Sequence, residues 1–178
     1  MSIYAKEVNK YLIAIKNGDK SSFKPLLDLI GGHVAGVARY YLDDKSYCDD
    51  VTAEVFQKIF LYINSYDEHK DGYNWICRIA QNIAYNYNEK AAKDIQITDI
   101  AVASGIAEPD ANTEEKLDLF RAIDSLEPDS REIIYLYFFF GNSFKEIGDK
   151  LHLSKAGVKK RIDKILSTLK IFIEHGKR

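Results

Sequence analysis

The sequence predicts an all-α fold in which two small helical domains are joined by an extended linker. Apolar residues recur at intervals of three and four along most of the 178 residues, which is the spacing of one helix face. Only three prolines and ten glycines interrupt that pattern. Residues 93–113 have no sustained period, are acidic, and contain Gly105 and Pro109, which is typical of a linker. An edge strand over residues 95–102 is the alternative there, but no second strand is predicted to pair with it.

The N-terminal domain, residues 1–92, is predicted to contain four helices, over residues 4–17, 21–41, 48–64 and 72–92. Asn17-Gly18-Asp19 separates the first two helices, because glycine favours a turn and aspartate caps a helix. Asp43-Asp44 precedes the third helix, and the polar run over residues 67–72 separates it from the fourth.

The C-terminal domain, residues 114–178, is predicted to contain four more helices, and the first of them begins at the last linker residue. They span residues 113–125, 128–140, 143–151 and 154–173. Pro128 suits the first turn of its helix, where the missing N–H does no harm. Gly141-Asn142 ends that helix and Ser143 caps the next one. The aromatic run over residues 135–140 is interpreted as core for the last two helices, and an exposed partner surface is the alternative for any ring that does not fit inside.

The composition excludes several classes of protein. Apolar residues make up 46% and charged residues 29%, which is ordinary for a soluble globular chain. No apolar run could cross a bilayer and the start does not resemble a signal peptide, so we expect a cytoplasmic protein without membrane insertion. Cys48 and Cys77 show no metal-ligand spacing and suit a reducing compartment as half-buried free thiols. Four scattered histidines and no nucleophile or phosphate loop predict no enzyme, no metal and no cofactor.

Charge is distributed unevenly along the chain. The net charge is −2, but residues 143–170 hold eight Lys and Arg against three Asp and Glu, a local net of +5. The N-terminal 113 residues hold 12 basic against 16 acidic residues, a net of −4. A basic segment inside an acidic chain indicates contact with nucleic acid.

That basic segment has the pattern of a helix-turn-helix. The apolar residues of its two helices fall on one face each: Phe144, Ile147 and Leu151 in the first, and Val158, Ile162, Ile165 and Leu169 in the second. Gly148 is small where the helices approach, and Ser154 can cap the second helix. The residues expected to reach DNA in the major groove are Ser154, Lys155, Lys159, Lys160, Arg161 and Lys164. The alternative is an amphipathic hairpin whose lysines only face water.

With the residues before it, this segment resembles region 4 of a bacterial sigma factor, in the run LEPDSREIIYLYFFFGNSFKEIGDKLHLSKAGVKKRIDKIL. The N-terminal half adds three further matches. DDVTAEVFQKIF is similar to region 2.2, GYNWICRIAQNIAYNY to regions 2.3 and 2.4, and KNGDKSSFKPLLDLI to region 2.1. Two such domains without a region 3 between them resemble the extracytoplasmic-function group of the sigma-70 class.

The resemblance implies an alternative sigma factor that binds core RNA polymerase and directs it to promoter DNA. Residues implied at the β′ clamp helices are Asp50, Glu54, Gln57 and Lys58. Residues implied at the −10 element, which they would help to open, are Tyr66, His69, Lys70, Tyr73, Arg78, Asn82, Tyr85, Asn86 and Lys90. The helix-turn-helix would read the −35 element and contact the β flap. Trp75, by contrast, is expected in the core with Ile79 and Ile83.

Several positions depart from the family pattern. Residues 82–90 contain Lys90 as their only cation, which weakens electrostatic binding to DNA. In the helix-turn-helix, Asp163 replaces a residue that is often basic, Gly157 replaces a threonine, and His152 occupies a turn position that requires positive φ. We therefore hypothesise that a DNA-locating partner, an activator or an RNA-guided complex, supplies part of the targeting.

Two further functions remain open at this point. One is a helix-turn-helix regulator that acts without core polymerase. The other is a polymerase-docking adaptor whose DNA site is chosen by its partner. An anti-sigma factor is a further partner that the resemblance implies.

Overall fold

The structure is a computed structural model that describes residues 2–94 and 113–176. The described residues form eight α-helices with short 3₁₀ and π segments and no strand, which confirms the predicted all-α fold. They divide into two compact units, residues 2–94 with 137–143, and residues 113–136 with 144–176. Most of the predicted linker, including the alternative strand over residues 95–102, lies outside the described residues.

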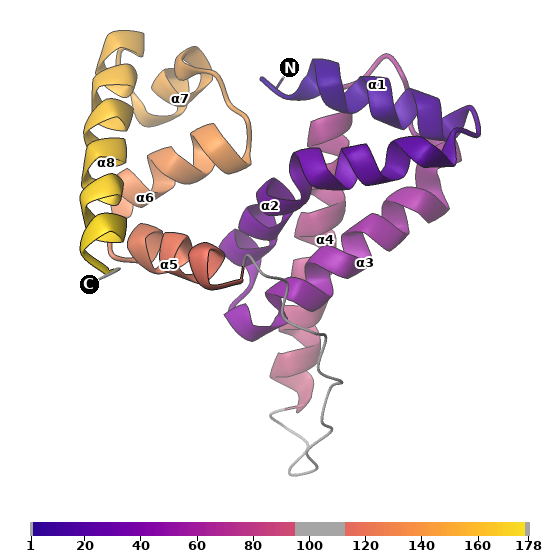
Figure 1. The fold of residues 1–178 in the computed structure, drawn as a ribbon, viewed down its shortest axis with the longest axis horizontal. Coiled ribbons are helices and arrows are strands. Elements are labelled where there is room, and N and C mark those ends of the chain that lie inside the picture. The colour runs from indigo at the N-terminus through magenta and orange to yellow at the C-terminus, as the bar shows by residue number, and fades with distance from the viewer. Residues whose placement is uncertain (1, 95–112, 177–178) are drawn as a thin grey trace. The chain divides into compact units, whose positions relative to one another are not determined.

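Four helices build the first unit, and Figure 1 draws them in indigo to magenta. They are α1 (Ala5–Lys16), α2 (Phe23–Tyr41), α3 (Cys48–Tyr62) and α4 (Gly72–Asp94). Three 3₁₀ turns lie between them, at Lys20–Ser22, Lys45–Tyr47 and Ile63–Ser65. Each predicted helix of this part is present, and its ends differ from the prediction by a few residues.

The core of the first unit lies where α2, α3 and α4 pack against one another. Apolar side chains spaced by three and four residues are buried along each helix, as in the Leu26, Ile30 and Val34 face of α2. Val8 and Leu12 of α1 are buried as well, and α1 packs on α4 and α2. Burial of such a side chain stabilises the fold by about 1.5–3 kcal/mol, so this core dominates the stability of the unit.

Residues 137–143 belong to the first unit. Within it, the Tyr4 hydroxyl donates to the carbonyl oxygen of Phe138 at 2.9 Å, and the Ile3 N–H donates to that of Gly141 at 3.0 Å. The prediction that the whole aromatic run is core for the helix-turn-helix is therefore wrong beyond Leu136. Successive residues of a helix point in different directions, so four consecutive rings cannot all face one core.

The second unit contains α5 (Thr113–Asp124), α6 (Pro128–Ile134), α7 (Phe144–Leu151) and α8 (Lys155–Gly176). Pro128 starts α6 as predicted, and a π-helical turn at Tyr135–Phe139 follows it. The long helix α8 packs on α5, α6 and α7 (Figure 1). The buried residues of this unit include Ile123, Ile133, Ile147 and Val158, so each of its four helices contributes to one core.

Substitution of two glycines, Gly148 and Gly32, should change the free energy of unfolding in opposite directions. A methyl group on Gly148 would lie 2.5 Å from the backbone carbonyl oxygen of Leu153, whereas one on Gly32 of α2 would meet nothing within 4 Å. Gly148→Ala should therefore lower the free energy of unfolding by about 2 kcal/mol, because a backbone atom cannot rotate away. Gly32→Ala should raise it by about 1 kcal/mol through helix propensity. Chemical denaturation followed by far-ultraviolet circular dichroism checks both, and equal effects would contradict the packing of the turn.

Candidate functional site

The first candidate surface is the outer face of α3. All four residues expected at the polymerase interface line one surface pocket, which we call the α3 pocket. Its full lining is Asp50, Ala53, Glu54, Gln57, Lys58, Leu61 and Tyr87. On the opposite side of α3, Val51, Val55 and Ile59 are fully buried, as the sequence predicts. The helix therefore turns one polar face outward, because residues three and four apart lie on the same side.

Opposite charges and a tyrosine meet in this pocket. The Lys58 Nζ lies 4.0 Å from a carboxylate oxygen of Glu54 and 5.8 Å from the ring centre of Tyr62. Burial raises the pKa of the Tyr87 hydroxyl, and the carboxylates of Glu54 and Asp50 raise it further. The pocket offers carboxylates to a partner, which suits a basic partner surface.

Sequence reasoning missed three residues of the pocket. Leu61 is 66% exposed and follows Gln57 by four residues, so helical spacing alone could have placed it on this face. Ala53 lies between Asp50 and Glu54 and lacks a functional group that would have singled it out. Tyr87 comes from α4, and its position depends on how α3 and α4 pack, which no local pattern indicates.

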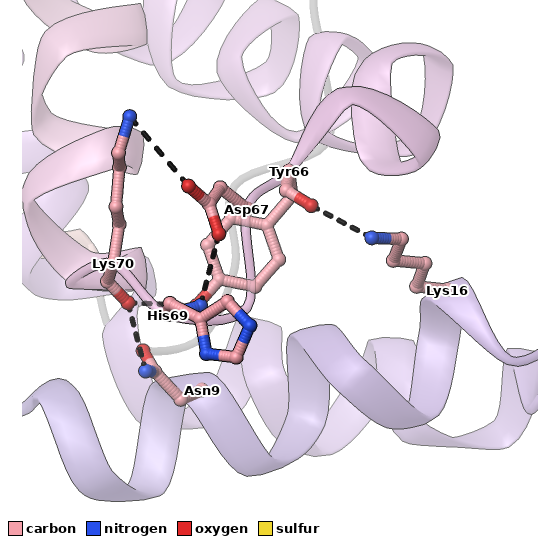
Figure 2. Close-up of polar contacts among 6 residues, drawn as sticks. All are labelled: Asn9, Lys16, Tyr66, Asp67, His69 and Lys70. Atoms are coloured by element: carbon pink, nitrogen blue, oxygen red, sulfur yellow. Dashed lines mark hydrogen bonds and ion pairs between the residues drawn. The ribbon is translucent and has the colours of Figure 1, made fainter.

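The second candidate surface begins at the loop between α3 and α4, where the structure departs from the expectation for two tyrosines. Tyr66 is 2% exposed and Tyr73 is fully buried. The Tyr66 hydroxyl donates to the carbonyl oxygen of Lys70 at 3.1 Å, and the Tyr73 ring meets the Tyr4 ring edge-on at 4.8 Å. The Tyr66 hydroxyl thus supports the loop from inside, the Tyr73 ring packs in the core at the start of α4, and neither ring is exposed. His69 and Lys70, by contrast, are exposed; Figure 2 shows their side chains on the loop.

The rest of the expected −10 residues lie along α4. They are all exposed and are spaced along one side of the helix: Arg78, Asn82, Tyr85, Asn86 and Lys90. Tyr85 is 46% exposed, and its hydroxyl accepts a hydrogen bond from the Gln81 Nε2 at 3.3 Å. The face, which we call the α4 stripe, combines one exposed aromatic ring with two amides and has its cations at the ends.

Trp75 is half-buried, which corrects part of the predicted core. Its ring lies 5.2 Å from the Tyr66 ring at an interplanar angle of 41°. The buried side chains of this part of α4 are Tyr73, Ile76, Ala80, Ile83 and Ala84. Trp75 therefore lies at the edge of the core face, and Ile79 is also only half-buried.

The third candidate surface is the helix-turn-helix of α7 and α8. The Ser154 Oγ accepts a hydrogen bond from the Gly157 N–H at 3.0 Å, which confirms the predicted cap of α8. His152 has φ +54°, so the turn requires the positive φ that the sequence predicts. Gly148 meets the turn at Leu153, which is where the predicted close approach occurs.

The outer face of α8 carries the basic side chains. Each residue expected at the −35 element is exposed: Ser154, Lys155, Lys159, Lys160, Arg161 and Lys164. The predicted core face is buried, with Val158 and Ile162 at 0% and 3% exposure. Asp163 is exposed beside these cations and reduces their net charge. This face can bind phosphates and base edges of a duplex.

The described residues hold none of the groupings that a metal ion would need. Cys48 and Cys77 are free and half-buried, as predicted, and burial raises the pKa of the Cys77 thiol to about 12. Among the helices the structure describes, none has the length and apolar character to cross a membrane.

Comparison with known proteins gives matches over both units. The sigma-70 region 2 family matches residues 26–93, and the sigma-70 region 4 family matches residues 116–169. The ECF RNA polymerase sigma factor SigM of Bacillus subtilis (strain 168) is 26% identical over 137 residues, which are 75% of this chain and 83% of the relative. The RNA polymerase sigma factor SigZ of the same strain is 33% identical over 136 residues, which are 75% of this chain and 76% of the relative.

A solved structure of the sigma factor RpoE in complex with the anti-sigma factor NepR, from Bartonella quintana, is also similar. It is 19% identical and has a TM-score of 0.47, over 85% of this chain and 96% of that one.

Two helical units, one of which carries a helix-turn-helix with a basic outer face, are the arrangement of a DNA-binding transcription factor. The chain belongs to the extracytoplasmic-function group of the sigma-70 family of RNA polymerase sigma factors and is an alternative sigma factor.

Proposed function

We propose that the chain docks on the clamp helices of core RNA polymerase through the α3 pocket and directs the enzyme to promoters. The observation that carries this proposal is the pocket itself. Four residues implied by the region 2.2 resemblance, Asp50, Glu54, Gln57 and Lys58, line it together. A mixed-charge surface on a rigid helix favours a specific orientation of the partner.

For the −10 element, we propose that the exposed loop side chains and the α4 stripe hold unpaired bases. An exposed ring such as Tyr85 can stack on an unstacked base, and the amides of Asn82 and Asn86 can hydrogen-bond to a base edge. Tyr66 and Tyr73 would act as supports of the loop, given their burial.

For the −35 element, we propose that the start of α8 enters the major groove. Lys155 and Lys159 lie near its N-terminal end, where a recognition helix contacts base edges. The flap of the β subunit is the second proposed contact of this unit, on the basis of the family resemblance.

A second candidate function rests on the charge of the α4 stripe. Arg78 and Lys90 are its only cations in the described residues, and Glu89 is exposed beside Lys90. Fewer cations release fewer counterions, so binding to DNA is weaker. This favours an adaptor whose promoter is chosen with a DNA-locating partner, either an activator or an RNA-guided complex.

We propose that the protein acts in the bacterial cytoplasm at the nucleoid, with an anti-sigma factor as its regulator.

Transcription with purified core polymerase and this chain alone tests the proposal. We expect chain-dependent initiation on genomic DNA at low salt, with mapped 5′ ends that share one −10 and one −35 element. Initiation that requires an added partner would support the adaptor instead. Duplex binding without any polymerase-dependent initiation or co-purification would contradict both and indicate an independent helix-turn-helix regulator.

A further inference from the structure

Helix α1 holds the backbone of the loop between α3 and α4 (Figure 2). The Lys16 Nζ donates to the carbonyl oxygen of Tyr66 at 2.8 Å. At the other end of the loop, the Asn9 Nδ2 donates to the carbonyl oxygen of Lys70 at 2.9 Å, and the Asn9 Oδ1 accepts from the Gly72 N–H at 2.8 Å. Two side chains of one helix thus fix both ends of the loop.

The loop also has its own internal support. The Asp67 carboxylate accepts from the His69 N–H at 3.1 Å and lies 3.6 Å from the Lys70 Nζ. The hydrogen bond from the His69 N–H lowers the pKa of the Asp67 carboxyl. Lys16 adds an ion pair with Glu68 at 3.2 Å. These contacts set the turn of the loop, whereas Asn9 and Lys16 fix that turn on the helical core.

Packing leaves little room between α1 and the start of α4. A methyl group on Gly72 would lie 2.5 Å from the Leu12 Cδ1 and 2.8 Å from the Asn9 Oδ1. Because residue 72 has no side chain, the Asn9 amide can reach the loop backbone. The region 2 match begins at residue 26, so α1 lies outside it.

We propose that Asn9 and Lys16 are positioning residues that pre-form the loop over residues 66–72 for unpaired promoter bases. This inference rests on the proposed function of that loop. Both residues act on backbone carbonyls and an N–H, so they fix the course of the chain and leave the His69 and Lys70 side chains exposed toward a ligand. A loop ordered in the free protein loses less conformational entropy on binding than a loose one, and it therefore binds more tightly.

The test uses holoenzyme assembled from core polymerase and full-length variants. The probes are a promoter fragment chosen from the mapped 5′ ends and a single-stranded oligonucleotide of its non-template −10 segment. Asn9→Ala and Lys16→Met should each lower affinity for the single strand and the yield of open complex by about tenfold, as expected for one or two lost hydrogen bonds. Lys6→Met, an exposed lysine on the same helix, is the matched control, and Lys16→Arg keeps the donor. Both should stay within about twofold of the unmodified chain.

Affinity for core polymerase separates positioning from folding. We expect it to be unchanged in all four variants, because the α3 pocket is untouched. Unchanged single-strand affinity in Asn9→Ala and Lys16→Met would overturn the inference, and so would a parallel loss of core affinity. The double variant His69→Ala/Lys70→Ala tests the loop itself. If this variant binds the single strand normally, the proposed function of the loop fails; if it binds weakly while the α1 variants bind normally, only the role of α1 fails.

Discussion

Asp50→Lys should weaken the binding of the chain to core RNA polymerase by at least about thirtyfold. Asp50 lines the α3 pocket, and its replacement by lysine sets a positive charge against the basic partner surface that the pocket carboxylates suit. The loss of one charge pair at an interface costs about 2 kcal/mol or more, which corresponds to that factor. Fluorescence anisotropy of the labelled chain, titrated with core polymerase at two salt concentrations, measures the affinity.

Asp49→Lys is the matched control for this variant. Asp49 is the neighbouring residue, is also exposed, and lies in the same first turn of α3, but it does not line the pocket. Both substitutions change the net charge by +2 and lose the same favourable interaction with the helix dipole, worth about 0.3–1 kcal/mol. Equal losses of affinity in both variants would show that only general charge matters and would contradict the pocket as the docking site.

Replacing Lys159, Lys160 and Lys164 by glutamine should weaken binding of the holoenzyme to duplex promoter DNA and flatten its salt dependence. Each phosphate contact contributes about 0.9 to the slope of log affinity against log salt, so the slope should fall by about 2–3. All three side chains are exposed on the outer face of α8. Filter binding or anisotropy between about 50 and 200 mM salt gives the slope.

The control variant removes the same number of positive charges elsewhere in the second unit. Lys145 and Lys150 lie on α7 and Lys170 lies near the end of α8, where it pairs with Glu174 at 3.9 Å. A Lys145→Gln/Lys150→Gln/Lys170→Gln variant should keep most of the slope. A loss equal to that of the first variant would mean that the unit attracts DNA by its total charge and does not use α8 as a recognition helix.

Features that depend on local spacing could be predicted from the sequence. The inward face of α3, with Val51 and Val55, follows from the helical period alone. The Ser154 cap and the positive φ of His152 follow from the few residue types that suit a cap and a tight turn. These positions are fixed within one or two turns of chain, so no knowledge of the packing is needed.

Features that depend on how the helices pack could not be predicted from the sequence. Tyr66 and Tyr73 look like exposed loop rings in the sequence, but both are buried: the Tyr66 ring lies against the Trp75 ring, and the Tyr73 ring packs on Tyr4, which precedes α1. Tyr87 joins the α3 pocket only because α4 packs against α3 there. Trp75 shows the limit of periodicity, since a shift of one position along α4 moves a ring from the core to its edge.

The most direct test of the central claim compares binding to one promoter fragment by the chain alone and by the chain with core polymerase. We expect tight binding and strand opening only when both are present, because in the proposed function the α3 pocket engages polymerase before the α4 stripe meets unpaired bases. Strand opening is followed by the fluorescence of 2-aminopurine placed in the −10 segment. Equal affinity with and without core polymerase, and no opening in either case, would contradict the account.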